Sequence, residues 1–188
     1  EDIEALIDQA GGSAFVYGVS SGAALAMEAA IKFPGKIKKL AMYEAPYWSD
    51  ESAIRAWKEY RQKLKEALAE DRRGDAAGLF LSLVGMPSDQ LEQMRREPWF
   101  AAFEAVAPTL AYDAAVLGED RVAPIGKAAE VSVPTLVMNG TASEGFMYDT
   151  ATALANAMPN AQHRALEGQT HAVTSEAIAP VLVEFFSS

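Results

Sequence analysis

Three kinds of side chain in this sequence could form a hydrolytic relay: a serine, a histidine and a carboxylate. Ser20 stands in Gly18-Val19-Ser20-Ser21-Gly22, a Gly-x-Ser-x-Gly pattern, and His171 lies near the end of the chain. A serine hydroxyl becomes a useful nucleophile only when a nearby base accepts its proton, and histidine is the usual base near neutral pH. The residue types therefore raise the hypothesis of acyl transfer through Ser20.

The flanks of the motif predict a strand, a sharp turn and a helix. A short apolar run, Ala14 to Tyr17, precedes the motif, and an alanine-rich helical pattern, Ala23 to Ala30, follows it. This arrangement is typical of a nucleophile elbow, in which we expect a strained backbone at Ser20 and a steric collision for any Cβ at Gly18 or Gly22. The alternative is a Gly/Ser-rich turn that only packs closely or binds a phosphate.

The motif and its flanks resemble the α/β-hydrolase superfamily, in particular its compact Gly-x-Ser-Ser-Gly members. The resemblance implies that Ser20 is the nucleophile and that the backbone N–H of Ser21 belongs to the oxyanion hole. It also implies that His171, in the loop after the last predicted strand, is the base. His163 lies inside that strand, and from this position we expect it to have a structural role. The resemblance covers the whole chain but begins at the helix before the elbow, so the family's first strands and its other oxyanion donor have no counterpart here.

The carboxylate of the relay is the least determined residue. In most of these hydrolases it follows the strand that ends here at Asn139, but Ser143 occupies that place. Some haloalkane dehalogenases of the same fold take the acid from the end of the strand after the elbow helix, where this chain has Glu44. We expect Glu44 to be the acid, with Glu144, Asp149 or no acid as the alternatives. A cap-anchoring role for Glu44 is the structural alternative.

The composition and net charge limit the classes of molecule that the protein is expected to bind. The 188 residues include 16 basic and 26 acidic side chains, a net charge of −10, and no cysteine. The negative charge disfavours nucleic acid or an anionic membrane as a partner and leaves small molecules as candidates.

With two histidines and no carboxylate cluster beside them, we expect no metal and no cofactor. No apolar stretch approaches the length of a spanning helix, and the charged start is unlike a signal peptide, so the expected location is cytoplasmic. A homo-oligomer stays open.

Alternating strands and helices predict an α/β fold: a mostly parallel sheet with helices on both faces. The last helix is expected to hold Pro180 in its first turn. Only four strands are visible, so we expect an exposed edge strand, and either a fragment or a sheet completed by another segment or a second chain. The predicted strands are 14–17, 37–43, 135–139 and 162–166, and the predicted domains are a core segment with the elbow (1–48), a helical cap (49–130) and a core segment with the histidine (131–188).

The expected function is a serine hydrolase that forms an acyl-enzyme. A nucleophilic serine, in place of an aspartate, disfavours dehalogenase and epoxide-hydrolase chemistry, while peptide, carbon–carbon bond and peracid chemistry stay open. An ester, lactone or thioester of a small apolar substrate suits the aromatic residues expected to line a pocket. The competing hypotheses are an inactive binding protein and one half of a two-part enzyme. The aromatic pocket candidates are Trp48, Trp57, Trp99 and Phe100.

Overall fold

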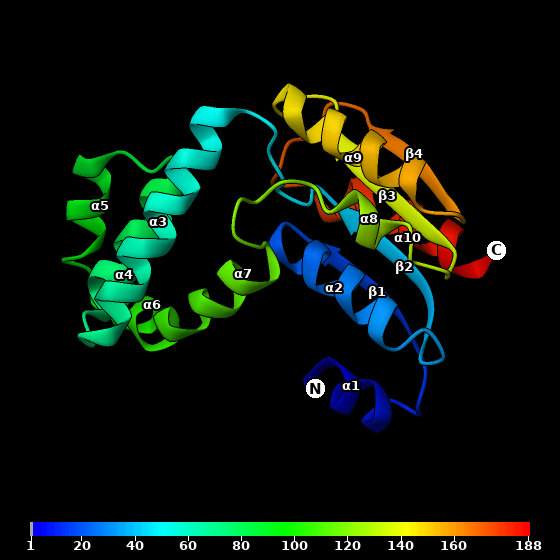
Figure 1. Ribbon diagram of the computed structural model, residues 1–188, viewed down its shortest axis with the longest axis horizontal. Helices are drawn as coiled ribbons and strands as arrows, with labels where there is room; N and C mark the ends of the chain where they lie inside the picture. The colour runs from blue at the N-terminus through cyan, green and yellow to red at the C-terminus, as the bar shows by residue number, and fades with distance from the viewer. Residues whose placement is uncertain (1) are drawn as a thin grey trace. The chain divides into compact units, whose positions relative to one another are not determined.

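Four parallel strands form one sheet in the computed structural model, which describes residues 2–188 (Figure 1). The strands lie side by side in chain order, each paired in parallel with the next. Because all four run in the same direction, their carboxyl ends meet at one edge of the sheet, which is where open α/β sheets bind ligands. The strands are β1 (Ala14–Val19), β2 (Ile37–Tyr43), β3 (Thr135–Gly140) and β4 (Ala161–Leu166), which include all four predicted strands.

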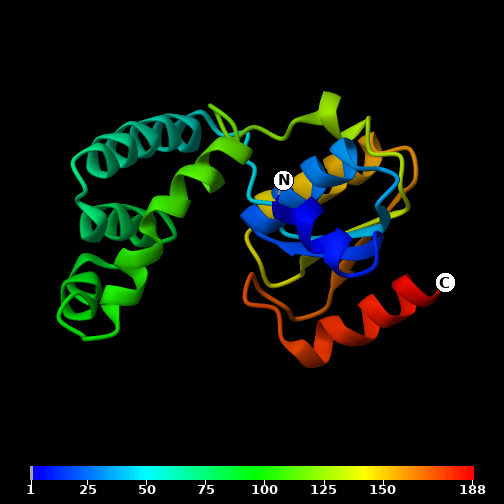
Figure 2. The same ribbon diagram turned by 90° about the horizontal axis from the view of Figure 1, so that it is seen from below.

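Helices cover both faces of this sheet (Figure 2). On one face, α2 (Ser21–Lys32) packs on β1 and β2, and α9 (Gly145–Ala157) packs on β3 and β4. On the other face lies α10 (Ser175–Ser187), as Figure 2 shows. The residues of β2 and of β3 that pack with it are two apart along each strand, as expected for side chains that point to the same face. The cluster beneath α10 consists of Ala41, Tyr43, Leu136, Met138 and Leu166 from the strands with Ile178, Val181 and Phe185 from the helix.

The N-terminal helix α1 (Asp2–Gln9) ends where the two consecutive glycines predict. Gly11 and Gly12 have φ of 108° and 84°, and the Gly12 N–H bonds the carbonyl of Ile7 at 2.9 Å. This left-handed ending suits glycine because a side chain there would be strained. Strand β1 lies at one edge of the sheet, and its Phe15 is 46% exposed. Such exposure is expected for an edge strand.

The position of Pro180 differs from the prediction. Helix α10 begins at Ser175, so Pro180 is its sixth residue and lies beyond the first turn. The Thr174 side chain caps the helix by accepting from the Ala177 N–H. A proline at this position removes one backbone hydrogen bond to the carbonyl four residues earlier. The cap and the three buried apolar residues of the helix offset that loss, so the helix starts a turn earlier than the proline indicated.

The chain forms two compact units by its internal contacts. The first comprises the residues up to Ser49 together with Val122–Ser188, and the second is Asp50–Arg121. The second unit is inserted after β2 and is helical throughout, whereas the short helix α8 (Ile125–Ala128) belongs to the first. The predicted domain division, with its limits at 48 and 130, stays a prediction, since compactness does not show independent folding. The helices of the second unit are α3 (Glu51–Ala69), α4 (Arg73–Leu83), α5 (Ser88–Met94), α6 (Phe100–Val106), the 3-10 turn η1 (Ala107–Thr109) and α7 (Leu110–Val116).

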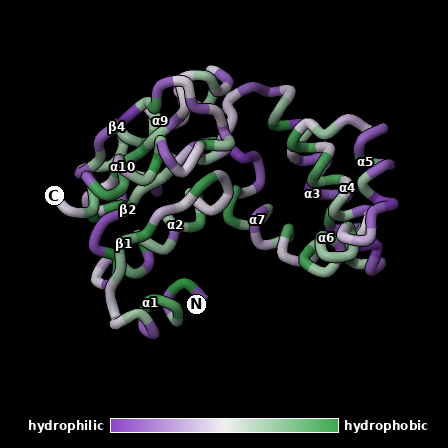
Figure 3. The backbone as a smooth tube through the Cα atoms, turned by 180° about the vertical axis from the view of Figure 1, so that it is seen from behind, coloured by the Kyte–Doolittle hydropathy of each residue, from purple (hydrophilic) through white to green (hydrophobic). Residues whose placement is uncertain are grey.

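Helix α3 is the longest element of the second unit, and its start is fixed by a side chain. The Asp50 carboxylate accepts the N–H groups of Ser52 and Ala53 at 2.9 and 3.1 Å, which satisfies donors that have no partner inside the helix. Helix α5, by contrast, buries none of its residues and is drawn largely in the hydrophilic colour (Figure 3). Within residues 2–188, no helix is both long and apolar enough to cross a membrane.

Candidate active site

The turn between β1 and α2 holds Ser20 in a strained backbone conformation. Its φ is 57° and its ψ is −131°, a region that residues with a side chain seldom occupy. The Ser20 N–H donates to the Tyr43 carbonyl at 3.0 Å, so the turn is tied to the end of β2. Ser20 is also the residue directly before α2, whose first N–H groups have no partner within the helix. The local geometry is that of an elbow, and it places Ser20 beside the residue preceding Glu44.

The two glycines of the motif differ in what they allow. A Cβ on Gly18 would lie 2.2 Å from the Gly22 carbonyl oxygen, which no side chain can tolerate. A Cβ on Gly22 would meet no atom within 4 Å. The prediction of a collision is therefore right for Gly18 and wrong for Gly22, because the crowding comes from the backbone of Gly22 and not from its missing side chain.

This difference gives a matched pair of substitutions. We expect Gly18→Ala to lower the free energy of unfolding by about 3 kcal/mol or to prevent folding, because the Gly22 backbone must move. We expect Gly22→Ala to be neutral, or to stabilise the chain by up to about 1 kcal/mol, since alanine is the better helix former. Urea unfolding measures both. Equal destabilisation by the two variants would contradict the elbow geometry described here.

Glu44 and His171 form a direct pair. The Oε2 of Glu44 lies 2.7 Å from Nδ1 of His171, and the Glu44 side chain is fully buried. The other carboxylate oxygen, Oε1, accepts the N–H of Gly140 at 2.8 Å. Because an ionised carboxylate only accepts, Nδ1 must donate, which leaves Nε2 of a neutral imidazole as an acceptor. The pair thus prepares the far nitrogen of His171 to take up a proton.

The surroundings of Glu44 favour its ionised form. Burial alone raises the pKa of this carboxyl, but hydrogen bonds from His171 and Gly140 outweigh it, and the net pKa is lowered. The Ser143 hydroxyl adds to this effect, although it is buried with no partner that meets hydrogen-bond geometry. Glu44 also has a positive φ of 48°, an uncommon state for glutamate. The bonds to His171 and Gly140 offset the cost of burying this anion. Backbone strain of this kind is found most often at functional sites.

The loop after β3 holds the backbone next to His171. Gly140 packs so closely that a Cβ on it would lie 2.0 Å from the Gln169 carbonyl oxygen. The Ala142 N–H donates to that same oxygen at 2.9 Å, and the Tyr43 hydroxyl donates to the Thr170 carbonyl at 2.6 Å. Sequence reasoning missed Tyr43 and Gly140 as supporting residues. The only local signal was the glycine at the end of β3, and its contact partner lies 29 positions away in the chain.

Ser20 and His171 lie at the same edge of the sheet but make no direct bond. Ser20 follows β1, Glu44 follows β2, and the His171 loop follows β4. Within residues 2–188, no hydrogen bond joins the Ser20 hydroxyl to His171, whose side chain is 47% exposed. The elbow and the Glu44–His171 pair are linked through Tyr43, whose carbonyl bonds the Ser20 N–H. Catalytic hydrogen bonds are often long before a substrate binds.

The alternative acids are placed differently. Glu144 directly precedes α9 and is exposed, and Asp149 lies exposed on that helix. In the described part of the chain neither forms a hydrogen bond to His171. His163 donates its Nε2–H to Asn139 Oδ1 at 2.7 Å, and its ring meets the Tyr148 ring edge-on with the centroids 5.4 Å apart. Burial lowers the pKa of His163. No group of three or more His, Asp or Glu side chains among residues 2–188 could hold a metal ion.

The aromatic pocket candidates differ in their surroundings within each unit. Trp48 stacks on Phe146 in the first unit, with ring centroids 3.6 Å apart. In the second unit, Trp57 is 3% exposed and donates its indole N–H to the Gly118 carbonyl at 3.0 Å. Phe100 is equally buried, and only Trp99 is exposed, at 47%. Trp57 and Phe100 are thus buried within the helical unit, and the assignment of the four aromatic residues to a substrate pocket stays a prediction.

Comparisons with known proteins found similar solved structures. The chain is 46% identical to an α/β hydrolase from Sphaerobacter thermophilus, with a TM-score of 0.80, covering 99% of this chain and 72% of that one. A hydrolase from Pseudomonas aeruginosa is 23% identical, with a TM-score of 0.67, covering 100% and 70%. MenH from S. aureus is 20% identical, with a TM-score of 0.64, covering 98% and 72%. No family model and no curated protein matches the sequence. The last two structures support the fold alone.

Proposed function

The chain belongs to the α/β-hydrolase superfamily, and we propose that it is a serine hydrolase acting on a carboxylic ester, lactone or thioester of a small, largely apolar substrate. A general hydrolase function is supported by its similarity to hydrolases. The finer proposal depends on one observation, the 2.7 Å pair between Glu44 and His171 beside a Gly-x-Ser-x-Gly elbow. The structural alternative, a carboxylate that only anchors the inserted unit, does not require an imidazole partner.

The proposed mechanism uses these groups in turn. The Ser20 hydroxyl attacks the carbonyl carbon and passes its proton to Nε2 of His171, while Glu44 holds the ring through Nδ1. The Ser21 N–H, at the start of α2, stabilises the oxyanion. The bond to the leaving alcohol or thiol then breaks, and His171 returns the proton to it. Water attacks the acyl-enzyme by the same route, which releases the acid and restores Ser20.

A further segment beside β1 is part of this proposal. Within the described residues β1 has a neighbour on one side only, and its Phe15 is 46% exposed. An exposed edge strand can pair with an additional strand from the same protein or from a second chain. Such a strand would cover this edge and offer a place for a second oxyanion donor. We therefore expect turnover to be highest in the form of the protein whose sheet is completed.

A fluorophosphonate probe with mass spectrometry tests whether Ser20 is an activated nucleophile. We expect one covalent adduct, on the tryptic peptide that ends at Lys32, because a serine reacts rapidly only beside a base. That peptide contains Ser13, Ser20 and Ser21, so the Ser20→Ala and Ser21→Ala variants identify the site. Labelling should vanish in the first variant and persist in the second. No adduct, beside a labelled control hydrolase, would favour an inactive binding protein.

A further inference from the structure

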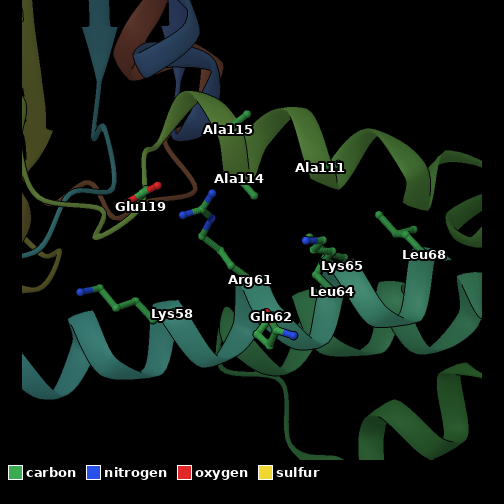
Figure 4. A pocket seen from close by; sticks show the side chains of 10 residues that line it. All are labelled: Lys58, Arg61, Gln62, Leu64, Lys65, Leu68, Ala111, Ala114, Ala115 and Glu119. Carbon is green, nitrogen blue, oxygen red and sulfur yellow. The ribbon is translucent and has the colours of Figure 1, made fainter.

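Three cations share one face of helix α3 in the second unit. Lys58, Arg61 and Lys65 are spaced by three and four residues, so their side chains lie on the same side of the helix. Figure 4 shows them on α3 at a cavity bounded on its far side by α7. Like charges at this spacing repel one another and weaken a helix. The arrangement is therefore not explained by the stability of α3 itself.

The other cations of α3 are paired as helix stability would favour. Arg55 pairs with Glu51 at 3.6 Å, and Lys63 pairs with Glu59 at 2.6 Å, both one turn apart. Lys58, Arg61 and Lys65, in contrast, form no ion pair with any residue of the described chain. This contrast occurs in a protein with an excess of ten acidic side chains, where partners are abundant. The three charges are thus left available to a ligand.

The cavity beside these cations combines charge with an apolar floor. Its volume is about 720 Å³, within the usual range of small-molecule sites. Leu64, which is 2% exposed, and Leu68 line it from α3, while Ala115 lines it from α7. Three cations and a single acid, Glu119, give the lining a net charge of +2. An apolar floor under a cationic rim suits a molecule with an aliphatic chain and an anionic head.

We propose that this groove between α3 and α7 binds a medium-chain aliphatic carboxylate. The carboxylate lies among Lys58, Arg61 and Lys65, where Arg61 can hold both of its oxygens through a planar guanidinium. The chain lies over Leu64, Leu68 and the alanines of α7, which leaves the aliphatic carbons out of water. The site goes beyond the proposed function, since it uses none of the groups of the relay.

Isothermal titration with octanoate, octanamide and acetate tests the site in the intact protein. We expect saturable binding of one octanoate, with octanamide and acetate each at least tenfold weaker, because the first lacks the charge and the second the chain. Octanoate affinity should also fall severalfold between low and moderate salt, since the contacts are ionic. Binding should be unchanged in a Ser20→Ala variant, so failure of the proposed hydrolase function would leave this result standing.

Matched variants locate the site. Arg61→Gln should weaken octanoate binding at least fivefold, whereas Arg55→Gln on the same helix should leave it within twofold. Ala115 is exposed, so Ala115→Trp should be tolerated by the fold and should block the groove; circular dichroism and melting of each variant check this. Equal binding of octanoate and octanamide, equal effects of the two arginine variants, or no saturable binding by the unmodified protein would overturn the proposal.

Discussion

Ser20→Ala is expected to lower kcat/KM for ester hydrolysis by about 10⁶-fold, which leaves only the residual catalysis that the oxyanion hole and substrate binding provide. The reason is that alanine removes the only atom that forms a bond to the substrate, while the elbow and the Glu44–His171 pair remain. Alanine also replaces the hydroxyl without adding volume, so the free energy of unfolding should stay within about 0.5 kcal/mol of the parent. Turnover of a chromogenic short-chain ester, together with urea unfolding, measures both quantities.

Ser21→Ala is the matched control for that experiment. Its side chain has no proposed role, and the backbone N–H that faces the oxyanion is kept in alanine, so we expect activity within about threefold of the parent. An equal loss in both variants would mean that the turn, and not the Ser20 hydroxyl, is what activity depends on. Loss only in Ser21→Ala would move the nucleophile by one position and end the assignment of Ser20.

The strands and the elbow could be predicted from the sequence because their signals are local. The apolar run before Ser20 and the glycine at position 18 specify a strand that turns sharply, and both features are present in the structure. The alternation of strands and helices likewise predicted a parallel sheet, which the strand pairing and the similar structures confirm. Such patterns depend on the backbone period alone.

What depends on contacts between distant residues could not be predicted. The Tyr43 hydroxyl donates to the Thr170 carbonyl, and Gly140 packs against Gln169. In neither case does the neighbouring sequence identify the distant partner. The same limit applies to the aromatic pocket candidates. The helical pattern of α3 places Trp57 on the inner face, but it does not indicate whether that face packs in a core or lines a pocket. The expectation for Glu44 comes from the resemblance to haloalkane dehalogenases, some of which take the acid from the end of the strand after the elbow helix, and its role in catalysis stays a proposal.

Glu44→Gln is expected to lower kcat by about 10⁴-fold. The two side chains are nearly isosteric, so the substitution leaves no cavity that would lower the free energy of unfolding. The amide must place its oxygen toward one neighbour and its NH₂ toward the other. With the oxygen on the Gly140 N–H, the NH₂ faces His171 Nδ1 and forces the ring proton onto Nε2, so the imidazole cannot accept from Ser20. With the amide reversed, its NH₂ and the Gly140 N–H face each other as two buried donors, which is unfavourable.

The Glu144→Gln variant and a pH series separate this role from a structural one. Glu144 is exposed and, within the described residues, forms no hydrogen bond to His171, so its substitution should leave kcat within about twofold of the parent. The pKa of Glu44 is lower in the folded chain than in the unfolded one, so its ionisation adds stability at neutral pH that is lost as the pH falls below about 4.3 toward the folded value. Glu44→Gln should therefore lose less unfolding free energy than the parent between pH 7 and pH 3. Only a carboxylate bonded to Nδ1 can orient the ring toward Ser20, so the loss of kcat should be confined to Glu44→Gln. An equal loss of kcat in both variants, or a loss only in Glu144→Gln, would remove Glu44 from the relay.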